Sequence, residues 1–215
     1  MTNTEEKTYT FAELSAKAKQ HARDSYTADG YLDHDWWDNV HEDAERVAKI
    51  LGIEFSARVR KLENCRELRK PYICFFGFYS QCDGACFEGN YTYNPKAVNE
   101  IKAYCNDEEL IRIATELNAL QLMRLLQGLS LFTAFITTRR SNYSHSNTMD
   151  VDVNCEGDEH IEVGDDLEET VQQLMRDFAD WIYNSLEAEH DWLHSDECVD
   201  AALVDEKFDE DGSVI

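Results

Sequence analysis

The chain has 215 residues, of which 44 are acidic and 20 basic, so its formal net charge at pH 7 is −24. Its 43% of apolar and 11% of aromatic residues are typical of a globular protein and exclude a disordered acidic chain, which is poor in aromatic residues. Every apolar run is shorter than the ~20 residues of a membrane-spanning helix, which excludes such a helix.

The first 52 residues predict two helices. Thr10 and Glu13 have the spacing of a capping box, and apolar residues then recur at helical spacing as far as Tyr26. A second amphipathic helix is predicted from about Asp33, with Gly52 as its terminator.

The hydrophobic period changes from helix to strand at Ile53. Residues 53–60 alternate between apolar and polar, which predicts a strand with one solvated face. Residues 72–79 are almost continuously apolar and predict an interior strand, and residues 87–93 alternate again. Between them, Asp83-Gly84 predicts a hairpin turn with positive φ at both central positions.

The following segment predicts a helix and two more strands. Asn106 has the character of an N-cap, and the helix that follows is apolar over most of its circumference, which predicts that it is buried. Residues 129–138 predict another interior strand, and 141–147 a polar loop. Residues 149–156 predict a strand with an acidic exposed face.

The longest predicted helix begins at Asp165 and carries one apolar stripe as far as Leu193. Ser195 is the expected N-cap of a short final helix. The element order indicates an α+β fold with an antiparallel sheet of about five strands packed with helices and a long acidic C-terminal helix.

Two prolines and nine glycines leave little room for a flexible linker. A single domain is therefore expected over residues 1–205, with an acidic C-terminal third over 150–205. Residues 206–215 are expected to form a frayed acidic tail.

Negative charge is concentrated in the last third of the chain. Residues 150–215 hold 23 acidic residues and two basic ones, a net charge of −21, whereas residues 1–149 hold 21 and 18, a net charge of −3. Charge distributed so unevenly bears on partners and solubility rather than on fold.

The long helix carries nine carboxylates against one opposing charge, Arg176, over residues 165–191. At about 1.5 Å per residue this is roughly one carboxylate per 4–5 Å, close to the ~3.4 Å between phosphates along one DNA strand. This spacing indicates a surface that imitates a nucleic-acid backbone and occupies a basic groove. The expected contact residues are Asp165, Asp166, Glu168, Glu169, Asp177, Asp180, Glu187 and Asp191.

Three other interpretations of the charged residues stay open. The acidic face is also compatible with a merely solvated surface. The basic residues of the segment 58–70 can fold against the acidic third and neutralise part of its field, or contact nucleic acid themselves.

Other chemistry has weaker support. His190 and His194 lie at i, i+4 on one helix face, a spacing that allows both imidazoles to coordinate one metal ion. A metal-dependent enzyme is therefore one alternative. Cys82 and Cys86, with Cys74 nearby, are interpreted as buried apolar thiols, since alternate strand residues point to opposite faces. No phosphate-binding loop, nucleophile elbow or dinucleotide fingerprint is present, so neither catalysis nor a cofactor is expected.

The compartment is predicted from the cysteines and the amino terminus. Seven cysteines, an odd number without a C-x-x-C pair, are typical of reduced thiols in the cytoplasm. The amino terminus has neither the basic start nor the apolar stretch of a signal peptide.

Residues 77–89, Gly-Phe-Tyr-Ser-Gln-Cys-Asp-Gly-Ala-Cys-Phe-Glu-Gly, and the segments 13–19 and 35–38 are distinctive. They resemble a group of largely uncharacterised proteins of phages, prophages and plasmids with a G-F-[WY]-S-Q-G-D-G-A-x-F core, some of which carry antitoxin-like labels. The resemblance covers about residues 11–93, and Cys82 departs from the usual glycine. It implies an origin in a mobile element, where blocking host defence is a common task.

Charge and resemblance together predict a non-enzymatic inhibitor in the host cytoplasm. Its expected partner is a basic nucleic-acid-binding protein or complex of the host, such as a CRISPR effector or restriction enzyme, without direct binding of nucleic acid or membrane. A homodimer is left open. The alternative binding function is that of an antitoxin-type protein that covers a basic toxin.

Overall fold

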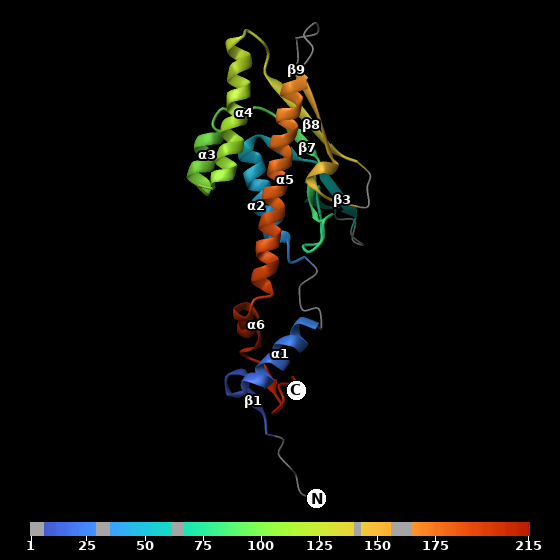
Figure 1. Ribbon diagram of the computed structural model, residues 1–215, viewed down its shortest axis with the longest axis vertical. Coiled ribbons are helices and arrows are strands. Elements are labelled where there is room, and N and C mark those ends of the chain that lie inside the picture. Colours follow the sequence, from blue (N-terminus) through green and yellow to red (C-terminus); the bar gives the residue numbers. More distant parts are fainter. Residues whose placement is uncertain (1–6, 29–34, 62–66, 140–142, 156–164) are drawn as a thin grey trace, which may run out of the picture. The chain divides into compact units, whose positions relative to one another are not determined.

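The computed structural model describes residues 7–28, 35–61, 67–139, 143–155 and 165–215 (Figure 1). The fold is α+β, as predicted, with helices, antiparallel strands and a long C-terminal helix. Two compact units divide the chain: residues 38–186 form the larger one, and residues 1–37 with 187–215 form the smaller one. The smaller unit includes residues 206–215, which were expected to form a frayed tail. The single domain expected over residues 1–205 stays a prediction.

The larger unit holds most of the secondary structure (Figure 1). Its helices are α2 (Asp38–Leu51), α3 (Ala97–Tyr104), α4 (Glu108–Leu126) and the part of α5 (Asp165–Leu193) up to Leu186. Its strands are β2 (Ile53–Phe55), β3 (Ala57–Lys61), β4 (Glu67–Pro71), β5 (Ile73–Phe76), β6 (Gly84–Phe87), β7 (Gly89–Tyr91), β8 (Phe132–Thr138) and β9 (Met149–Cys155).

The strands form one larger sheet and two hairpins. The antiparallel sheet has four strands in the order β2-β7-β8-β9, while β3 pairs with β4 and β5 with β6. The single strand predicted over residues 53–60 is interrupted at Ser56. The Ser56 N–H donates to the Glu88 carbonyl, and the Ser56 carbonyl accepts from the Tyr72 N–H, so the chain changes its pairing partner at this residue.

The core of the larger unit is built around α5. Phe178 is fully buried, and its ring lies 5.6 Å from that of Phe87 and 6.3 Å from that of Phe55. Gln121 of α4 is buried and ties that helix to β8, since its amide donates to the Phe132 carbonyl and accepts from the Phe132 N–H. These contacts fix α4 and α5 relative to the strands.

Helix α4 differs from its prediction at both ends. Its N-cap is Asp107, whose side chain accepts from the Leu110 N–H, while Asn106 takes a positive φ of 51°. Its C-terminal turns are not buried as expected, since Leu126 is 88% exposed. Leu122, Met123 and Leu125 are exposed as well. Neighbouring elements therefore cover only one side of these last turns, where Gln121 and Arg124 are buried, and leave the other side exposed. Helix α3 was not predicted.

The predicted hairpin is present as β5–β6, but its loop is built differently. The expected interior strand over 72–79 ends at Phe76, which is 52% exposed, and Gly77 has a positive φ of 53°. The Asp83 carboxylate closes the loop by accepting from the Tyr79 and Ser80 N–H groups, each at 2.6 Å. Gly84 begins β6 and is required for space, because a Cβ there would lie 2.6 Å from that of His145.

The smaller unit is formed by the two ends of the chain. It contains β1 (Tyr9–Thr10), a 3-10 turn over Phe11–Glu13, α1 (Ala16–Ala28), the end of α5, α6 (Asp196–Leu203) and β10 (Lys207–Phe208). Strand β1 pairs with β10, so the end of the chain is held rather than frayed. Phe208 is fully buried, with its ring 5.9 Å from that of Phe11.

The predicted capping box of Thr10 and Glu13 is confirmed in part, and the predicted Ser195 cap is confirmed. Glu13 accepts from the Thr10 N–H and hydroxyl, but this capping box opens the 3-10 turn rather than α1. Ser195 caps α6, as its hydroxyl accepts from the Cys198 N–H.

An ion pair between α1 and α6 should make the smaller unit sensitive to acid. Arg23 contacts Asp200 at 2.6 and 2.7 Å, and hydrogen bonding to this guanidinium holds the pKa of Asp200 below its ordinary value. A carboxyl group whose pKa is lower in the folded than in the unfolded state stabilises the fold at pH values above the unfolded pKa of about 4. This stabilisation is lost as the pH falls through the folded-state pKa. We expect the free energy of unfolding to fall between about pH 5 and pH 2, and to fall less in Arg23→Gln.

Urea titrations of the full chain at several pH values measure this difference. Arg46→Gln, which removes a helix-surface pair with Glu42, is the matched control and should leave the pH dependence unchanged. Equal acid sensitivity in wild type and Arg23→Gln would show that this ion pair has no such role.

Over the described residues, no helix combines the length and apolarity needed to cross a membrane.

Candidate functional site

The carboxylates of α5 lie mostly on one side of the helix. Asp166, Glu169, Asp177 and Asp180 recur at helical spacing and form what we call the acidic face, opposite the buried Leu174, Phe178 and Ile182. Asp166, Glu168, Glu169 and Asp180 are exposed. The side chain of Asp165 lies outside the described residues. Glu187 and Asp191 belong to the part of α5 in the smaller unit, where Asp191 is exposed and Glu187 half-buried.

One arginine neutralises part of the acidic face. Arg112 of α4 bonds to Asp177, whose side chain is only 17% exposed, and also to Glu109 and Glu116. The hydrogen bonds that the guanidinium donates to these carboxylates, Glu109 first, raise the pKa of Arg112 above its ordinary value. Asp177 is therefore engaged within the chain, and Asp166, Glu169 and Asp180 are the members of the face that point to solvent.

Asp180 has a mixed environment. Partial loss of solvent around its carboxylate raises the pKa of Asp180 above the ordinary value, and the nearby charge of Asp177 adds to this, against a hydrogen bond with Ser146. The residue as a whole remains exposed. A cation that approaches it would lower this pKa again and so favour the charged form.

The acidic residues of the strand predicted over 149–156 are divided between paired and solvated ones. Asp150 of β9 is paired with Arg139 at 2.6 and 2.8 Å, and this hydrogen bonding lowers the pKa of Asp150. Asp152 is exposed on the same strand. The acidic residues between 156 and 162 lie outside the described part of the chain.

The basic segment 58–70 makes contacts with β5 and α2. Arg58 bonds to Cys74 of β5, and Lys70 contacts both oxygens of Asp38 at 2.9 Å. The side chains of Arg60, Lys61 and Arg66 lie outside the described residues. The described contacts of Arg58 and Lys70 are thus with neighbouring elements of the same unit.

His190 and His194 lie close together, with ring centroids 4.0 Å apart and ring planes tilted by 34°. The pKa of His190 lies below its ordinary value because of burial and the proximity of His194. The His194 Nδ1 lies 2.8 Å from the His190 carbonyl oxygen. Among the described residues, no group of three or more His, Cys, Asp or Glu side chains has the arrangement of a metal site.

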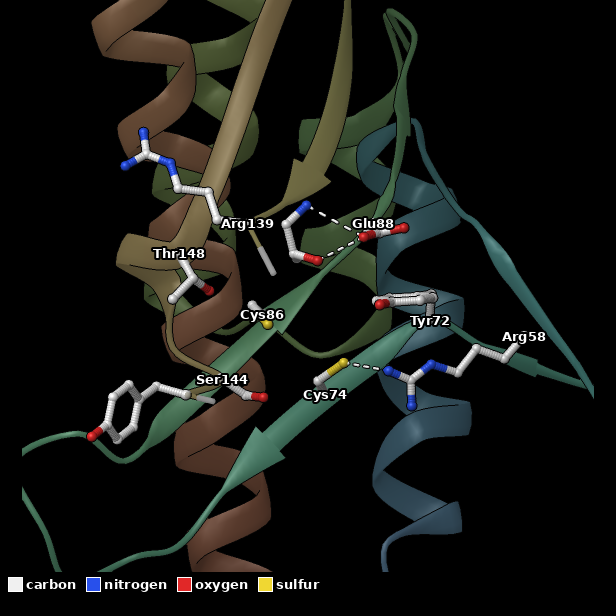
Figure 2. A pocket seen from close by; sticks show the side chains of 10 residues that line it. Arg58, Tyr72, Cys74, Cys86, Glu88, Arg139, Ser144 and Thr148 are labelled. Carbon is white, nitrogen blue, oxygen red and sulfur yellow. Dashed lines mark hydrogen bonds between the residues drawn. The ribbon is translucent and has the colours of Figure 1, made fainter. Parts of the chain in front are cut away.

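A cavity of about 900 Å³ lies where β3, β5, β6 and the loop before β9 meet (Figure 2). Two cysteines, two arginines and one glutamate line it together with hydroxyl side chains. The lining residues are Arg58, Tyr72, Cys74, Cys86, Glu88, Thr138, Arg139, Tyr143, Ser144 and Thr148.

Cys74 and Cys86 are directly opposite each other on β5 and β6. Directly opposed residues of antiparallel strands point to the same face, so both thiols reach the cavity, as Figure 2 shows. A hydrogen bond from Cys86 and the positive charge of Arg58 lower the pKa of Cys74 to about 7, against burial and the charge of Glu88. The same hydrogen bond and burial raise the pKa of Cys86 above its ordinary value.

Arg58 is held in place by an aromatic ring. Its guanidinium carbon lies 4.1 Å from the centroid of the Tyr72 ring, and its Nη2 is 2.6 Å from the Cys74 Sγ. Glu88, in the same lining, accepts a 2.6 Å hydrogen bond from the Thr138 hydroxyl. The cavity therefore combines a guanidinium that contacts the Cys74 thiol with a carboxylate.

This cavity was not predicted from the sequence. The interpretation of the cysteines as apolar thiols treated each strand alone, whereas the pairing of β5 with β6 brings Cys74 and Cys86 together. The sequence does contain a feature that predicts this pairing. Cys74 and Cys86 each lie three residues from a loop over residues 77–83, so a hairpin closed by that loop places them opposite each other.

A family model described as a domain of unknown function (DUF8835) matches residues 36–196. The match covers more than half of the chain, so the chain belongs to this family. No curated protein and no solved structure matches the chain. The resemblance of residues 11–93 to mobile-element proteins is not tested by this match and stays a prediction.

Proposed function

We propose that this member of the DUF8835 family is a non-enzymatic binding protein that offers exposed carboxylates of α5 to a basic surface of another protein. The partner would be a nucleic-acid-binding defence complex of a bacterial host, such as a CRISPR effector or a restriction enzyme. The chain would occupy the channel that normally holds nucleic acid. It would act in the cytoplasm of that host.

The observation that carries the proposal is the exposure of Asp166, Glu168, Glu169 and Asp180 on a helix anchored by its buried side. Because α5 is fixed to the core through Phe178, these carboxylates are held in position before binding. A prearranged row of charges loses less side-chain entropy on binding than the same charges on a flexible tail. It would gain Coulomb attraction and counterion release from a basic channel, as DNA does.

Arginines of the chain itself pair with some of the acidic residues, so these carboxylates are not available to a partner. Arg112 engages Asp177, Arg139 engages Asp150, and Arg23 engages Asp196 and Asp200. The proposal therefore rests on the solvent-facing carboxylates of α5 rather than on the total charge of −24.

A displacement assay tests the function. Fluorescent duplex DNA is bound to each of a panel of purified restriction enzymes and CRISPR effector complexes at about 50 mM salt, and the full chain is titrated in. We expect the chain to displace DNA from at least one of them and to show no binding to the DNA itself. If every DNA complex persists at low salt, the proposed mimicry is wrong.

An antitoxin-type role would give a different outcome in a related experiment. The tagged chain, expressed together with its neighbouring genes, would then co-purify with a small basic protein and leave the DNA complexes of the panel intact. Capture of a DNA-binding complex that releases its DNA supports the proposed function instead.

A further inference from the structure

We propose that Cys74 and Cys86 form a peroxide-reactive thiol pair, in which the Cys74 sulfur attacks a hydroperoxide that enters the cavity and Cys86 then closes a disulfide with it. The pair would make the β5–β6 hairpin a site of reversible oxidation. The inference rests on the cavity and is independent of the acidic face.

The backbone geometry allows the disulfide. Cys74 and Cys86 are Cα partners in the register of β5 and β6, and both are reduced thiols. Opposed residues of antiparallel strands have Cα atoms about 4.5–5.5 Å apart, within the roughly 4.4–6.8 Å that a disulfide spans. The strands therefore need not separate for the bond to form.

The surroundings give the two thiols different roles. Thiolate is the nucleophilic form of cysteine, and Cys74 is stabilised in this form by the Arg58 guanidinium and by the hydrogen bond from Cys86. Cys86 is 3% exposed and keeps its proton next to a negative sulfur, so it does not compete for the oxidant. Cys74 is half-buried and is the sulfur that solvent reaches first.

The cavity also suits the leaving group of a hydroperoxide. A volume of about 900 Å³ admits hydrogen peroxide and larger organic hydroperoxides. Ser144 and Thr148 supply hydroxyl groups next to the thiols, since both hydrogen-bond to Cys86, whereas the Arg139 guanidinium points away from them and is paired with Asp150 (Figure 2). Hydroxyl groups of this kind stabilise the negative oxygen that departs when an O–O bond breaks.

Two steps transfer two electrons from the thiols to the peroxide. The Cys74 thiolate attacks one peroxide oxygen, the O–O bond breaks, and the departing hydroxide or alkoxide takes a proton from solvent, leaving a sulfenic acid on Cys74. Cys86 then loses its proton and attacks the Cys74 sulfur, the S–O bond breaks, and the departing hydroxide takes a proton to form water. The product is the Cys74–Cys86 disulfide.

Oxidation of the full chain with stoichiometric hydrogen peroxide at pH 7 tests the inference. We expect peptide mass spectrometry to find a Cys74–Cys86 disulfide that a dithiol reagent reverses. In Cys86→Ser, a sulfenic acid on Cys74 should persist and react with dimedone. Cys105→Ser, at an exposed thiol on another element, is the matched control and should leave the Cys74–Cys86 disulfide unchanged.

The pH dependence of alkylation distinguishes a Cys74 thiol with a lowered pKa from one that is only accessible to solvent. We expect Arg58→Gln to slow iodoacetamide alkylation of Cys74 at pH 6, by roughly tenfold for each unit by which the pKa rises. Glu88→Gln should accelerate the alkylation by a smaller factor, because the thiolate fraction saturates as the pKa falls to the pH of the assay. Circular dichroism checks that each variant is folded. The inference is overturned if Cys74 reacts no faster than the exposed Cys82 and Cys105, or if oxidation links other cysteines.

Discussion

Neutralising the solvent-facing carboxylates of α5 should weaken displacement of DNA from the susceptible effector by about one to three orders of magnitude. The variant carries Asp166→Asn, Glu168→Gln, Glu169→Gln and Asp180→Asn. An exposed ion pair contributes about 0.2–1 kcal/mol, and each factor of ten in affinity corresponds to about 1.4 kcal/mol. The inhibition constant in the displacement assay measures the loss.

A second variant separates position from total charge. Replacing Glu42, Glu54, Glu100 and Glu108 with Gln removes the same number of exposed carboxylates from α2, β2, α3 and α4. We expect this variant to lose only the small, long-range part of the attraction. Equal losses in the two variants would mean that the partner senses net charge and not the acidic face.

Truncation of Phe178 to Ala should destabilise the larger unit by about 3–5 kcal/mol, a large share of the stability of a typical domain. Phe178 is fully buried against Phe55 and Phe87, so the change removes apolar contacts and leaves a cavity. Urea denaturation followed by far-UV circular dichroism gives the free energy of unfolding.

Leu126→Ala is the matched control for this truncation. Leu126 is 88% exposed on α4, so its replacement should change the free energy of unfolding by no more than about 0.5 kcal/mol. A similar effect of the two truncations would contradict the packing of α5 described above. This packing is also what holds the carboxylates in place, so Phe178→Ala should weaken DNA displacement under conditions where it is partly unfolded.

The parts of the fold that depend on local pattern were predictable. The stripe of α5, the Ser195 cap and the alternation of β9 are each encoded within a few turns or residues. The division of residues 53–60 at Ser56 was not, because it depends on hydrogen bonds to Glu88 and Tyr72 from other segments.

Burial on α4 shows the limit of hydrophobicity as a guide. Leu122 and Leu126 are as apolar as Leu110 and Leu117, yet the first two are exposed and the last two buried. What distinguishes them is which elements cover the helix, and this depends on the tertiary fold. The loop before Gly84 shows the same limit, since the glycine is required by the nearby His145 and not by a positive φ.

The candidate sites follow the same division. The accumulation of acidic residues on α5 is readable from spacing alone, but its partial neutralisation by Arg112 requires the contact between α4 and α5. The Cys74–Cys86 pair requires the register of β5 and β6, and the role of Arg58 requires the β3–β4 hairpin to bring it to Cys74. The positions of the acidic residues could be predicted from the sequence, whereas the arginines that pair with them could not.

The salt dependence of complex formation is the most direct measure of whether the carboxylates of α5 replace DNA phosphates. We expect the logarithm of the association constant between the chain and the susceptible effector to fall linearly with the logarithm of the salt concentration. Between 50 and 200 mM salt the affinity should fall by about tenfold or more. The slope should be shallower in the α5 variant than in wild type. An affinity that is unchanged by salt, or an equal slope in both proteins, would contradict binding through this face.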